Sequence, residues 1–227
     1  MMIPDRQTVT FILASASPRR RQLLGLTGWG VIVRPVEVDE APKPGELAEV
    51  MARRLALAKM RATVSIQDMN GVILAADTIV ADGDQSLGKP VNTSEAEAML
   101  MNLRGRSHCV YTAIALTDLR SNREEIDICK TIVPMRDYSQ DEIEAYILSG
   151  DPLDKAGSYG IQDNGFRPVA VGMLKDCYTN VMGLPLCHVV RAMRSLGHPP
   201  TVDVPAACQI FTGFKCTVHP GILGHCK

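Results

Sequence analysis

The chain has 227 residues, of which 46% are hydrophobic and 22% are charged, and its formal net charge is −1 at pH 7. A chain of this size and composition can bury a sizeable core without disulfides or a structural metal. The balanced charge excludes a global field that would draw the protein onto nucleic acid or an anionic membrane, so recognition of phosphate has to come from local clusters.

The N-terminal segment predicts no export signal, because charged Asp5 and Arg6 stand where a signal peptide needs apolar residues. No apolar run is long enough to span a membrane, so we expect a cytoplasmic protein. The short apolar run "TFILAS", residues 10–15, predicts a buried strand. A helix should follow at once, since Ser17 suits the N-cap and Pro18 suits the first helical position.

Three arginines, Arg19, Arg20 and Arg21, fall in the first turn of this predicted helix. Cations oppose the helix dipole at that end, and a bound anion would remove the conflict. Because helix N-termini and arginines both favour phosphate, the cluster predicts an anion site. The alternative is a surface turn with solvated arginines, and we expect Arg21 in particular to face solvent.

Further along, residues 31–40 predict a strand in which Pro35 marks an edge position. An apolar stripe predicts a helix over 46–64, and "GVILAADTIVADG", residues 71–83, predicts a second buried strand. The remaining predicted elements are a helix with a capping box of Ser94 and Glu97 that is closed by Gly105, strands over 108–118 and 123–135, a helix with a capping box of Ser139 and Glu142 that ends at Gly150, a glycine-rich loop over 154–165, and a helix at the end of 180–197.

Strands and helices alternate along the chain, and hairpin-like neighbours also occur. This order predicts an α/β protein with a mixed sheet and flanking helices. The triplet "HPP" breaks the pattern after Gly197. We therefore expect a main domain over 1–197 and an appended tail over 198–227.

Asp77 is the strongest candidate for chemistry, because it lies inside the apolar strand "VILAADTIVA". A buried carboxylate is costly unless it is paired, binds a metal or faces a cleft. The alternative, an aspartate that caps a turn at a strand end, fits poorly because apolar and β-branched residues follow it. Glu40 ends the predicted strand "VEVDE" and is either solvated or completes an oxygen-ligand Mg²⁺ site with Asp77.

Three lysines suit a clamp for a polyphosphate when they are taken together with Arg19 and Arg20. Lys59 lies at the edge of the apolar helix stripe, where snorkelling to water is the alternative. Lys89 lies in the stiff turn "GKP", and Lys155 lies in "DKAGSYG", whose glycines let backbone N–H groups approach an anion.

The motifs "LASASPRRRQLL", "AADTIV", "LGKP", "DKAGSYGIQ" and "NVMGLPL" resemble, in this order, those of the Maf family of nucleoside triphosphate pyrophosphatases, and they extend over residues 11–197. The resemblance implies an elongated mixed α/β fold with two lobes around a central cleft, similar to the inosine triphosphate pyrophosphatases. It also implies hydrolysis between the α- and β-phosphates, which gives a monophosphate and pyrophosphate, with a divalent metal such as Mg²⁺ or Mn²⁺.

The same resemblance assigns expected roles to residues of this chain. Asp77 matches the catalytic carboxylate and, with Glu40, the metal ligands. One branch of the family acts on dTTP and UTP, and a second branch acts on 7-methyl-GTP; Arg19, Thr78 and Gln162 match the base-selecting positions of the first. The polar lining of the cleft is matched by Ser15, Arg20, Glu40, Lys59, Lys89 and Lys155. One departure is Asp163, which stands beside Gln162 where the pattern has glycine.

Two other functions compete with this enzyme. A nucleotide-sensing regulator of cell division would need the phosphate clamp but not a carboxylate inside an apolar strand, so Asp77 favours the enzyme. A nucleic-acid binder that uses the arginine cluster is disfavoured by the balanced charge and by the scarcity of aromatic residues for stacking. The expected partner is therefore a nucleoside triphosphate, without nucleic acid or membrane, and a homodimer stays open as the assembly.

The tail holds a group of three cysteines and two histidines, and thiolates with imidazoles are ligands that Zn²⁺ selects. The spacing lacks the close CxxC pair of most zinc sites, so the alternative is a tail packed on the body through apolar side chains. The potential ligands are Cys208, Cys216, His219, His225 and Cys226, and the potential apolar anchors are Ile210, Phe211, Phe214 and Ile222. The other four cysteines are scattered and are expected to be reduced.

Overall fold

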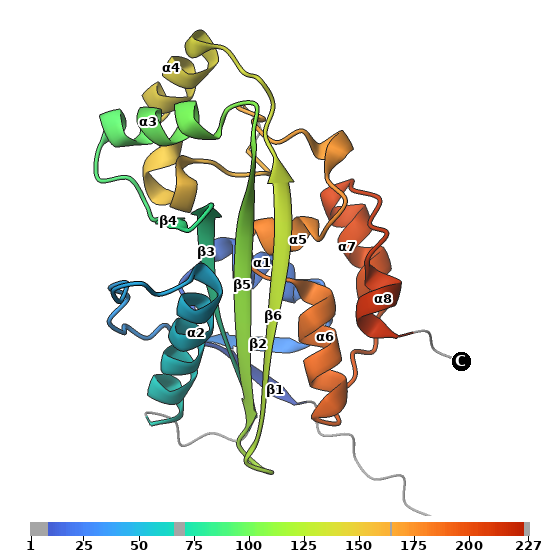
Figure 1. Cartoon of the computed structure of the whole chain (residues 1–227). Helices are drawn as coiled ribbons and strands as arrows, with labels where there is room; N and C mark the ends of the chain where they lie inside the picture. The colour runs from blue at the N-terminus through green and yellow to red at the C-terminus, as the bar shows by residue number, and fades with distance from the viewer. Residues whose placement is uncertain (1–8, 66–70, 164, 225–227) are drawn as a thin grey trace, which may run out of the picture.

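A mixed sheet organises the chain (Figure 1). The structure, a computed structural model, describes residues 9–65, 71–163 and 165–224. Within these residues the sheet has six strands in the order β2-β1-β3-β5-β6, and β4 pairs with β3. The strands are β1 (Thr10–Leu13), β2 (Gly30–Val33), β3 (Val72–Asp82), β4 (Gln85–Leu87), β5 (Ser107–Asp118) and β6 (Arg123–Pro134).

The sheet mixes parallel and antiparallel pairs around β3. β1 runs parallel to β2 and β3, whereas β5 runs antiparallel to β3 and β6. Phe11, Ile12 and Leu13 of β1 are fully buried, which explains the continuous apolar run, since a parallel strand is covered on both faces. The predicted mixed α/β architecture is confirmed.

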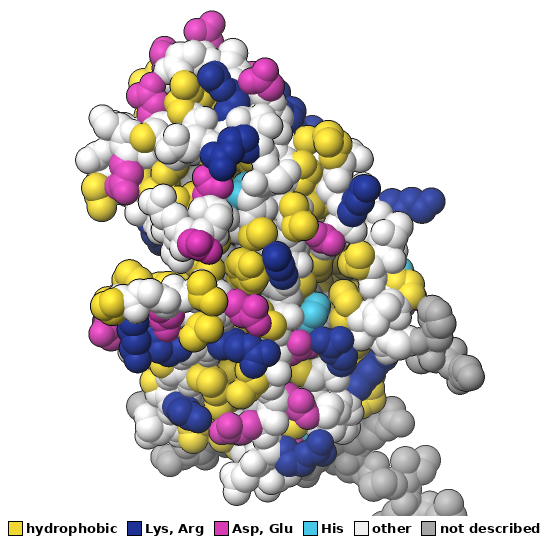
Figure 2. All heavy atoms as spheres, viewed as in Figure 1, with side chains coloured by type: hydrophobic (Ala, Val, Ile, Leu, Met, Phe, Trp, Pro, Cys, Tyr) yellow, Lys and Arg dark blue, Asp and Glu magenta, His cyan; other side chains and the backbone are white. Residues whose placement is uncertain are grey.

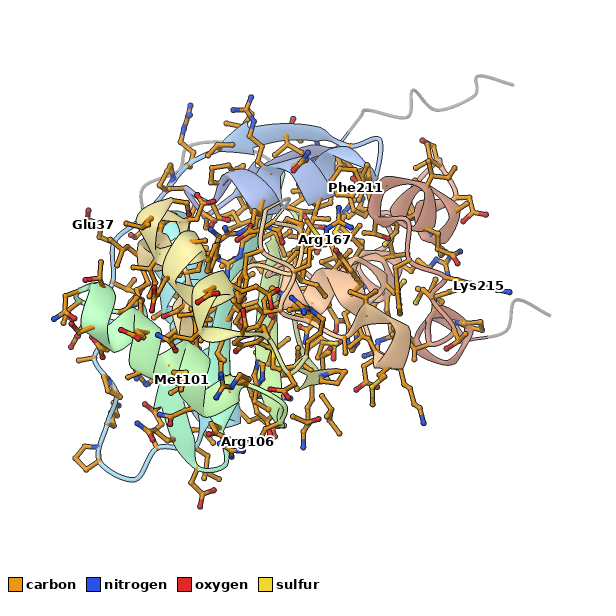
Figure 3. All side chains as sticks on the ribbon, turned by 90° about the horizontal axis from the view of Figure 1, so that it is seen from above. Glu37, Met101, Arg106, Arg167, Phe211 and Lys215 are labelled. Carbon is orange, nitrogen blue, oxygen red and sulfur yellow. The ribbon has the colours of Figure 1, made fainter. Side chains whose placement is uncertain are left out.

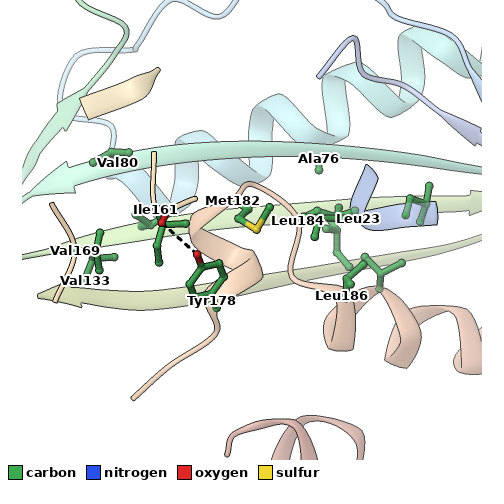
Figure 4. Packing of buried hydrophobic residues seen from close by; sticks show 14 of the residues in the cluster. Leu23, Ala76, Val80, Val133, Ile161, Val169, Tyr178, Met182, Leu184 and Leu186 are labelled. Carbon is green, nitrogen blue, oxygen red and sulfur yellow. Dashed lines mark hydrogen bonds between the residues drawn. The ribbon is translucent and has the colours of Figure 1, made fainter. Parts of the chain in front are cut away.

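Helices cover both faces of this sheet (Figure 1). Met51, Leu55 and Met60 of α2 pack against Ile73 and Ala75 on one face of the sheet. The other face carries a larger apolar cluster, part of which is shown in Figure 4, with side chains from α1, α5 and α6. The helices are α1 (Pro18–Gly25), α2 (Ala48–Val64), α3 (Thr93–Leu103), α4 (Gln140–Leu148), α5 (Tyr178–Val181), α6 (Leu186–Ser195), α7 (Val204–Thr212) and α8 (His219–Leu223), with 3-10 turns η1 (Asp151–Asp154), η2 (Ala156–Ser158) and η3 (Val171–Met173).

The molecule has two lobes that share the long strands β3, β5 and β6. One lobe contains β1, β2, α1 and α2, and the other contains α3, α4 and the 3-10 turns η1 and η2 (Figure 1). On the face seen in Figure 2, basic and acidic side chains are interspersed. Within the described ranges, none of the helices is long and apolar enough to cross a lipid bilayer.

Local capping signals mark the helix starts. Ser17 is the N-cap of α1, and its hydroxyl accepts a hydrogen bond from the Arg20 N–H at 3.4 Å, as predicted. The capping box of Ser139 and Glu142 at α4 is also confirmed. The predicted box of Ser94 and Glu97 is wrong, because α3 begins earlier. The N-cap of α3 is Asn92, whose side chain accepts a hydrogen bond from the Glu95 N–H at 2.9 Å. Asn92 and Glu95, two residues upstream, therefore stand where the sequence predicted Ser94 and Glu97.

The tail after Gly197 is helical and lies against α5 and α6. Val204 is 1% exposed, and the Phe214 ring lies 5.5 Å from the Tyr178 ring of α5. Two of the expected anchors are wrong: Ile210 is 85% exposed and Phe211 is 36% exposed, because the turn of α7 that carries them faces away from the core. Viewed from above, Lys215 projects away from the body after α7 (Figure 3).

The potential zinc ligands of the tail do not gather in the described part of the chain. Among residues 9–65, 71–163 and 165–224, no three His, Cys, Asp or Glu side chains lie together in a way that could hold a metal ion. Cys208 and Cys216 carry free thiols. His225 and Cys226 lie outside the described residues.

Candidate active site

A cavity of about 630 Å³ lies between the two lobes, where β1 ends and β3 continues. β1 pairs with β3 only as far as Leu74, and the chain then leaves the sheet to begin α1. The edge of β3 beyond Leu74 is therefore open toward this cavity until β4 pairs with it at Val80. The cavity is lined by every residue that the sequence predicted for the site: Ser15, Arg19, Arg20, Glu40, Lys59, Asp77, Thr78, Lys89, Lys155 and Gln162.

Asp77 lies in the middle of β3 and is 6% exposed. Its Oδ1 accepts a hydrogen bond from the Lys59 Nζ of α2 at 2.6 Å. Burial raises the pKa of Asp77, and the nearby charges of Lys59 and Arg20 offset this increase only in part. A carboxylate with a raised pKa is more basic than an ordinary aspartate, which suits it to accept a proton near neutral pH.

Lys59 holds Glu40 as well as Asp77, with the Glu40 Oε1 at 2.5 Å from its Nζ. The predicted position of Glu40 at a strand end is wrong, because β2 ends at Val33. β1 supplies no partner beyond Leu13, and Pro35 cannot donate to a ladder, so the segment that carries Glu40 is irregular. Glu40 nevertheless reaches the cavity, with 60% of its side chain exposed.

Arg20 is held by uncharged oxygens. Its Nε donates to the Gly183 carbonyl at 2.8 Å, its Nη1 to the Ser15 hydroxyl at 3.2 Å and its Nη2 to the Thr78 hydroxyl at 3.0 Å. Removal from water lowers the pKa of Arg20, and the charge of Asp77 opposes this change. A guanidinium without a bonded carboxylate keeps its charge available for an anion in the cavity.

The three base-selecting candidates differ in their surroundings. Arg19 and Gln162 line the cavity from opposite lobes, on α1 and on the segment after η2. The Thr78 hydroxyl contacts Arg20 and also lies 3.0 Å from the Thr112 hydroxyl. The Thr78 hydroxyl therefore has hydrogen-bond partners on Arg20 and on β5.

Two further cleft lysines each have a carboxylate of their own. Lys89 pairs with Asp154 at 2.6 Å, and both side chains are largely exposed. Lys155 is 9% exposed, and its Nζ lies 2.7 Å from the Asp151 carbonyl and 3.1 Å from the Asp163 Oδ2. Asp163, which stands where the family pattern has glycine, thus forms an ion pair with Lys155 of the cleft.

Asp163 is fixed from two more sides. Its Oδ2 accepts a hydrogen bond from the Tyr146 hydroxyl at 2.6 Å. A Cβ on Gly160 would stand 2.4 Å from the Asp163 Oδ1, so only glycine leaves room for this carboxylate. The sequence indicated that Asp163 is unusual, but it did not predict these partners.

Charges of both signs line the cavity. The acidic Glu37, on the segment after β2, projects outward (Figure 3). The basic lining residues are Arg19, Arg20, Lys59, Lys89 and Lys155, and the acidic lining residues are Glu37, Glu40, Asp77 and Asp154. With Asp163 behind Lys155, the two signs are nearly balanced.

Comparison with known proteins decides the family. A family model described as "Maf-like protein" matches residues 10–196. The chain belongs to the Maf-like protein family. This membership confirms the resemblance that the five sequence motifs predicted.

Relatives of this Maf-like protein carry a common description. A protein of Thermomicrobium roseum described as "dTTP/UTP pyrophosphatase" is 44% identical over 88% of this chain and 92% of its own length. A protein of Symbiobacterium thermophilum with the same description is 43% identical over 83% of this chain and 94% of its own length. Among solved structures, the Ham1 protein of Staphylococcus aureus aligns with a TM-score of 0.42 at 14% identity, over 70% of this chain and 79% of that chain.

Proposed function

We propose that this Maf-like protein hydrolyses nucleoside triphosphates, with dTTP and UTP preferred, to the nucleoside monophosphate and pyrophosphate. The observation that carries the proposal is the buried Asp77 carboxylate, which shares one cavity with the basic groups of a polyphosphate clamp. The description "dTTP/UTP pyrophosphatase" of relatives that align over most of the chain supports the same reaction. A sensor without turnover would have no use for a basic carboxylate in this place.

The residues present suit a divalent metal such as Mg²⁺ or Mn²⁺. Oxygens of Asp77 and Glu40 converge on one cation, the Lys59 ammonium, at 2.6 and 2.5 Å. Mg²⁺ is commonly held by one or two carboxylates together with substrate phosphates, so these two carboxylates are sufficient protein ligands. When bound, the metal would polarise the phosphate and lower the pKa of a nearby water.

In the proposed mechanism Asp77 acts as the general base. Its Oδ1 is the oxygen that Lys59 contacts and that a metal would share, so its Oδ2 is the oxygen that orients a water and accepts its proton. The water attacks the α-phosphorus, and the bond to the β-phosphate oxygen breaks. Arg20, Lys89 and Lys155 then offset the negative charge on the departing pyrophosphate, which is how proteins chiefly assist phosphoryl chemistry.

We assign base selection to Arg19 and Gln162. A guanidinium and an amide can both donate hydrogen bonds to the carbonyl groups of thymine and uracil. Thr78, the third expected base-selecting residue, has its hydroxyl bound to Arg20, so its effect on the base would be exerted through that arginine.

The cytoplasm is the compartment that we propose for this reaction. Cys109, Cys129, Cys177, Cys187, Cys208 and Cys216 carry free thiols, which a reducing compartment maintains.

The reaction itself gives a direct test. Purified protein with Mg²⁺ or Mn²⁺ should release pyrophosphate from dTTP and UTP, with higher kcat/KM than from CTP, dATP or GTP. The assay measures pyrophosphate and identifies the nucleotide product. Release of orthophosphate with a nucleoside diphosphate would contradict cleavage between the α- and β-phosphates. A preference for 7-methyl-GTP would contradict the assignment of Arg19 and Gln162.

The pH profile tests the pairing of Lys59 with Asp77. The positive charge of Lys59 lowers the pKa of Asp77, so Lys59→Met should raise that pKa further above its ordinary value. Because the base must be deprotonated, activity is lost as the pH falls through this pKa, and the acidic limb of kcat/KM should move to higher pH. Arg61→Met, an exposed charge change on the same helix, is the control and should leave the limb in place. An unmoved limb in Lys59→Met would mean that another group titrates.

A further inference from the structure

The motif "NVMGLPL", residues 180–186, has no role in the proposed reaction so far, yet it lies beside the cavity. Leu184 and Leu186 are fully buried, and the Tyr178 hydroxyl at the start of α5 donates to the Ile161 carbonyl at 3.2 Å. Figure 4 shows Tyr178, Met182, Leu184 and Leu186 packed against the strands. The segment is therefore well packed against the rest of the protein.

Gly183 in this segment contacts the phosphate clamp directly. Its carbonyl accepts the Arg20 Nε at 2.8 Å. Its φ is +102°, and an added Cβ would stand 3.4 Å from the Thr78 hydroxyl and 3.6 Å from the Arg20 Nε. Glycine thus allows both the backbone conformation and the close approach of the guanidinium.

Asn180 fixes the position of this segment against the sheet. It is fully buried, and its Nδ2 donates to the Val110 carbonyl at 3.0 Å and to the Thr131 hydroxyl at 2.9 Å. The backbone carbonyl of Asn180 accepts a hydrogen bond from the Thr112 hydroxyl at 3.2 Å. Buried polar contacts of this kind specify one arrangement, because a lost partner leaves a group unsatisfied.

The hydroxyls between Asn180 and Arg20 have one consistent direction of donation. Each hydroxyl has a single proton, and the Thr112 hydroxyl donates its proton to the Asn180 carbonyl. The Thr112 oxygen can then accept the proton of Thr78, which lies directly opposite it in the β3–β5 register at 3.0 Å between the hydroxyl oxygens. The Gly183 carbonyl, at 3.5 Å from the Thr78 hydroxyl, is a second acceptor for the same proton. Thr78 is left with lone pairs for the Arg20 Nη2.

We propose that Thr112 and Asn180 are positioning residues that hold the Arg20 guanidinium toward the triphosphate. Both are fully buried and neither lines the cavity, so we expect them to act on the substrate only through Thr78 and Arg20. Neutral partners orient the guanidinium without neutralising it, which a carboxylate partner would do. The inference rests on the proposed function, since it names residues that set the geometry of that same site.

A double-mutant cycle tests the proposal. Thr112→Val removes the hydroxyl and keeps the shape, and it should lower kcat/KM for dTTP roughly tenfold, the scale of one good hydrogen bond. In an Arg20→Met background the same change should have no further effect, because the group on which it acts is gone. Equal losses in the two backgrounds, or no loss in the wild-type background, would overturn the proposal.

Matched variants separate positioning from folding. Thr112→Ser keeps the hydroxyl, so its kcat/KM should be close to the wild-type value. If Thr112→Val does not fold, Thr112→Ser is the variant whose kcat/KM is measured in both the wild-type and the Arg20→Met backgrounds, and it should match its background in each. Thr27→Val removes another fully buried threonine hydroxyl, which bonds the Leu24 carbonyl at the end of α1, and it should lower Tm without lowering kcat/KM. Failure of serine to restore kcat/KM, or a comparable loss in Thr27→Val, would indicate a merely structural role.

A binding measurement separates this inference from the proposed function. The Kd of a non-hydrolysable dTTP analogue should rise with Thr112→Val only where Arg20 is present. If wild-type protein binds the analogue but releases no pyrophosphate from dTTP, the proposed function is rejected. The double-mutant cycle can then still be measured through Kd. An active wild type with additive effects in Kd would reject the positioning role alone.

Discussion

Replacing Asp77 by asparagine should lower kcat for dTTP by at least about a hundredfold, the usual scale for loss of a general base. The amide keeps the shape of the side chain in β3 but cannot accept a proton from water, and it is a poorer ligand for a divalent metal. Turnover is measured as pyrophosphate release at saturating substrate. A variant with near-normal kcat would contradict the role of Asp77.

The same substitution should leave Tm unchanged or raise it, which shows that the lost activity is not a loss of fold. Burial raises the pKa of Asp77 in the folded state. The folded state therefore binds this proton more tightly than the unfolded state, and ionisation of Asp77 costs stability as the pH rises through the folded pKa. An asparagine does not ionise, so this cost is absent at neutral pH.

Asp118 is the matched control, because it is also a buried aspartate of the sheet at 5% exposure. Burial raises its pKa, but hydrogen bonds from the Arg120 N–H, His198 and Ser121 outweigh burial and lower the pKa overall. A carboxylate whose pKa is lower in the folded state than in the unfolded state stabilises the fold at every pH above its unfolded-state pKa. Asp118→Asn should therefore lower Tm and keep kcat, which is the reverse of the result for Asp77.

Arg20→Lys should lower kcat/KM by roughly a hundredfold although the charge is kept, within the range for loss of one preorganised donor to a developing anion. The planar guanidinium contacts Ser15, Thr78 and the Gly183 carbonyl together and still faces the cavity. The single ammonium group of lysine cannot donate to these three oxygens in the same planar geometry. Steady-state kinetics with dTTP and UTP measure the loss.

Arg21→Lys is the control for this prediction. Arg21 is the next residue of the same helical turn and is exposed, as the sequence predicted. The change in chemistry is identical, but the geometry of the clamp is untouched, so kcat/KM should stay at the wild-type value. Similar losses in the two variants would mean that the general basicity of the turn matters and that the three contacts of Arg20 do not.

Much of the fold was predictable because its signals are local. The strand and helix at residues 10–25 follow from an apolar run, an N-cap and a proline that stand side by side, and the structure confirms each. The long strands β3, β5 and β6 follow in the same way from their apolar and β-branched residues. Where two local signals competed, as between Asn92 and Ser94, the sequence did not decide which of them capped the helix.

The contacts of the site were less predictable because they join distant parts of the chain. Lys59 could equally have extended into water, and only the packing of α2 on β3 brings its Nζ to Asp77. The bond from Arg20 to the Gly183 carbonyl spans 163 positions and involves a backbone atom, which no residue pattern reveals. Thr112 looked like an ordinary strand residue for the same reason.

The mixture of charges around the cavity has a consequence for how a substrate arrives. A cleft lined by one sign of charge focuses the field, concentrates counter-ions and speeds their association. Here Lys59, Lys89 and Lys155 each face a carboxylate at 2.6 to 3.1 Å, so their fields largely cancel outside the cavity. We therefore expect free phosphate and sulfate to be attracted only weakly, and a triphosphate to reach the cavity without strong electrostatic steering from these lysines. We expect discrimination to begin on contact, when phosphate oxygens would compete with the carboxylates for the same lysines.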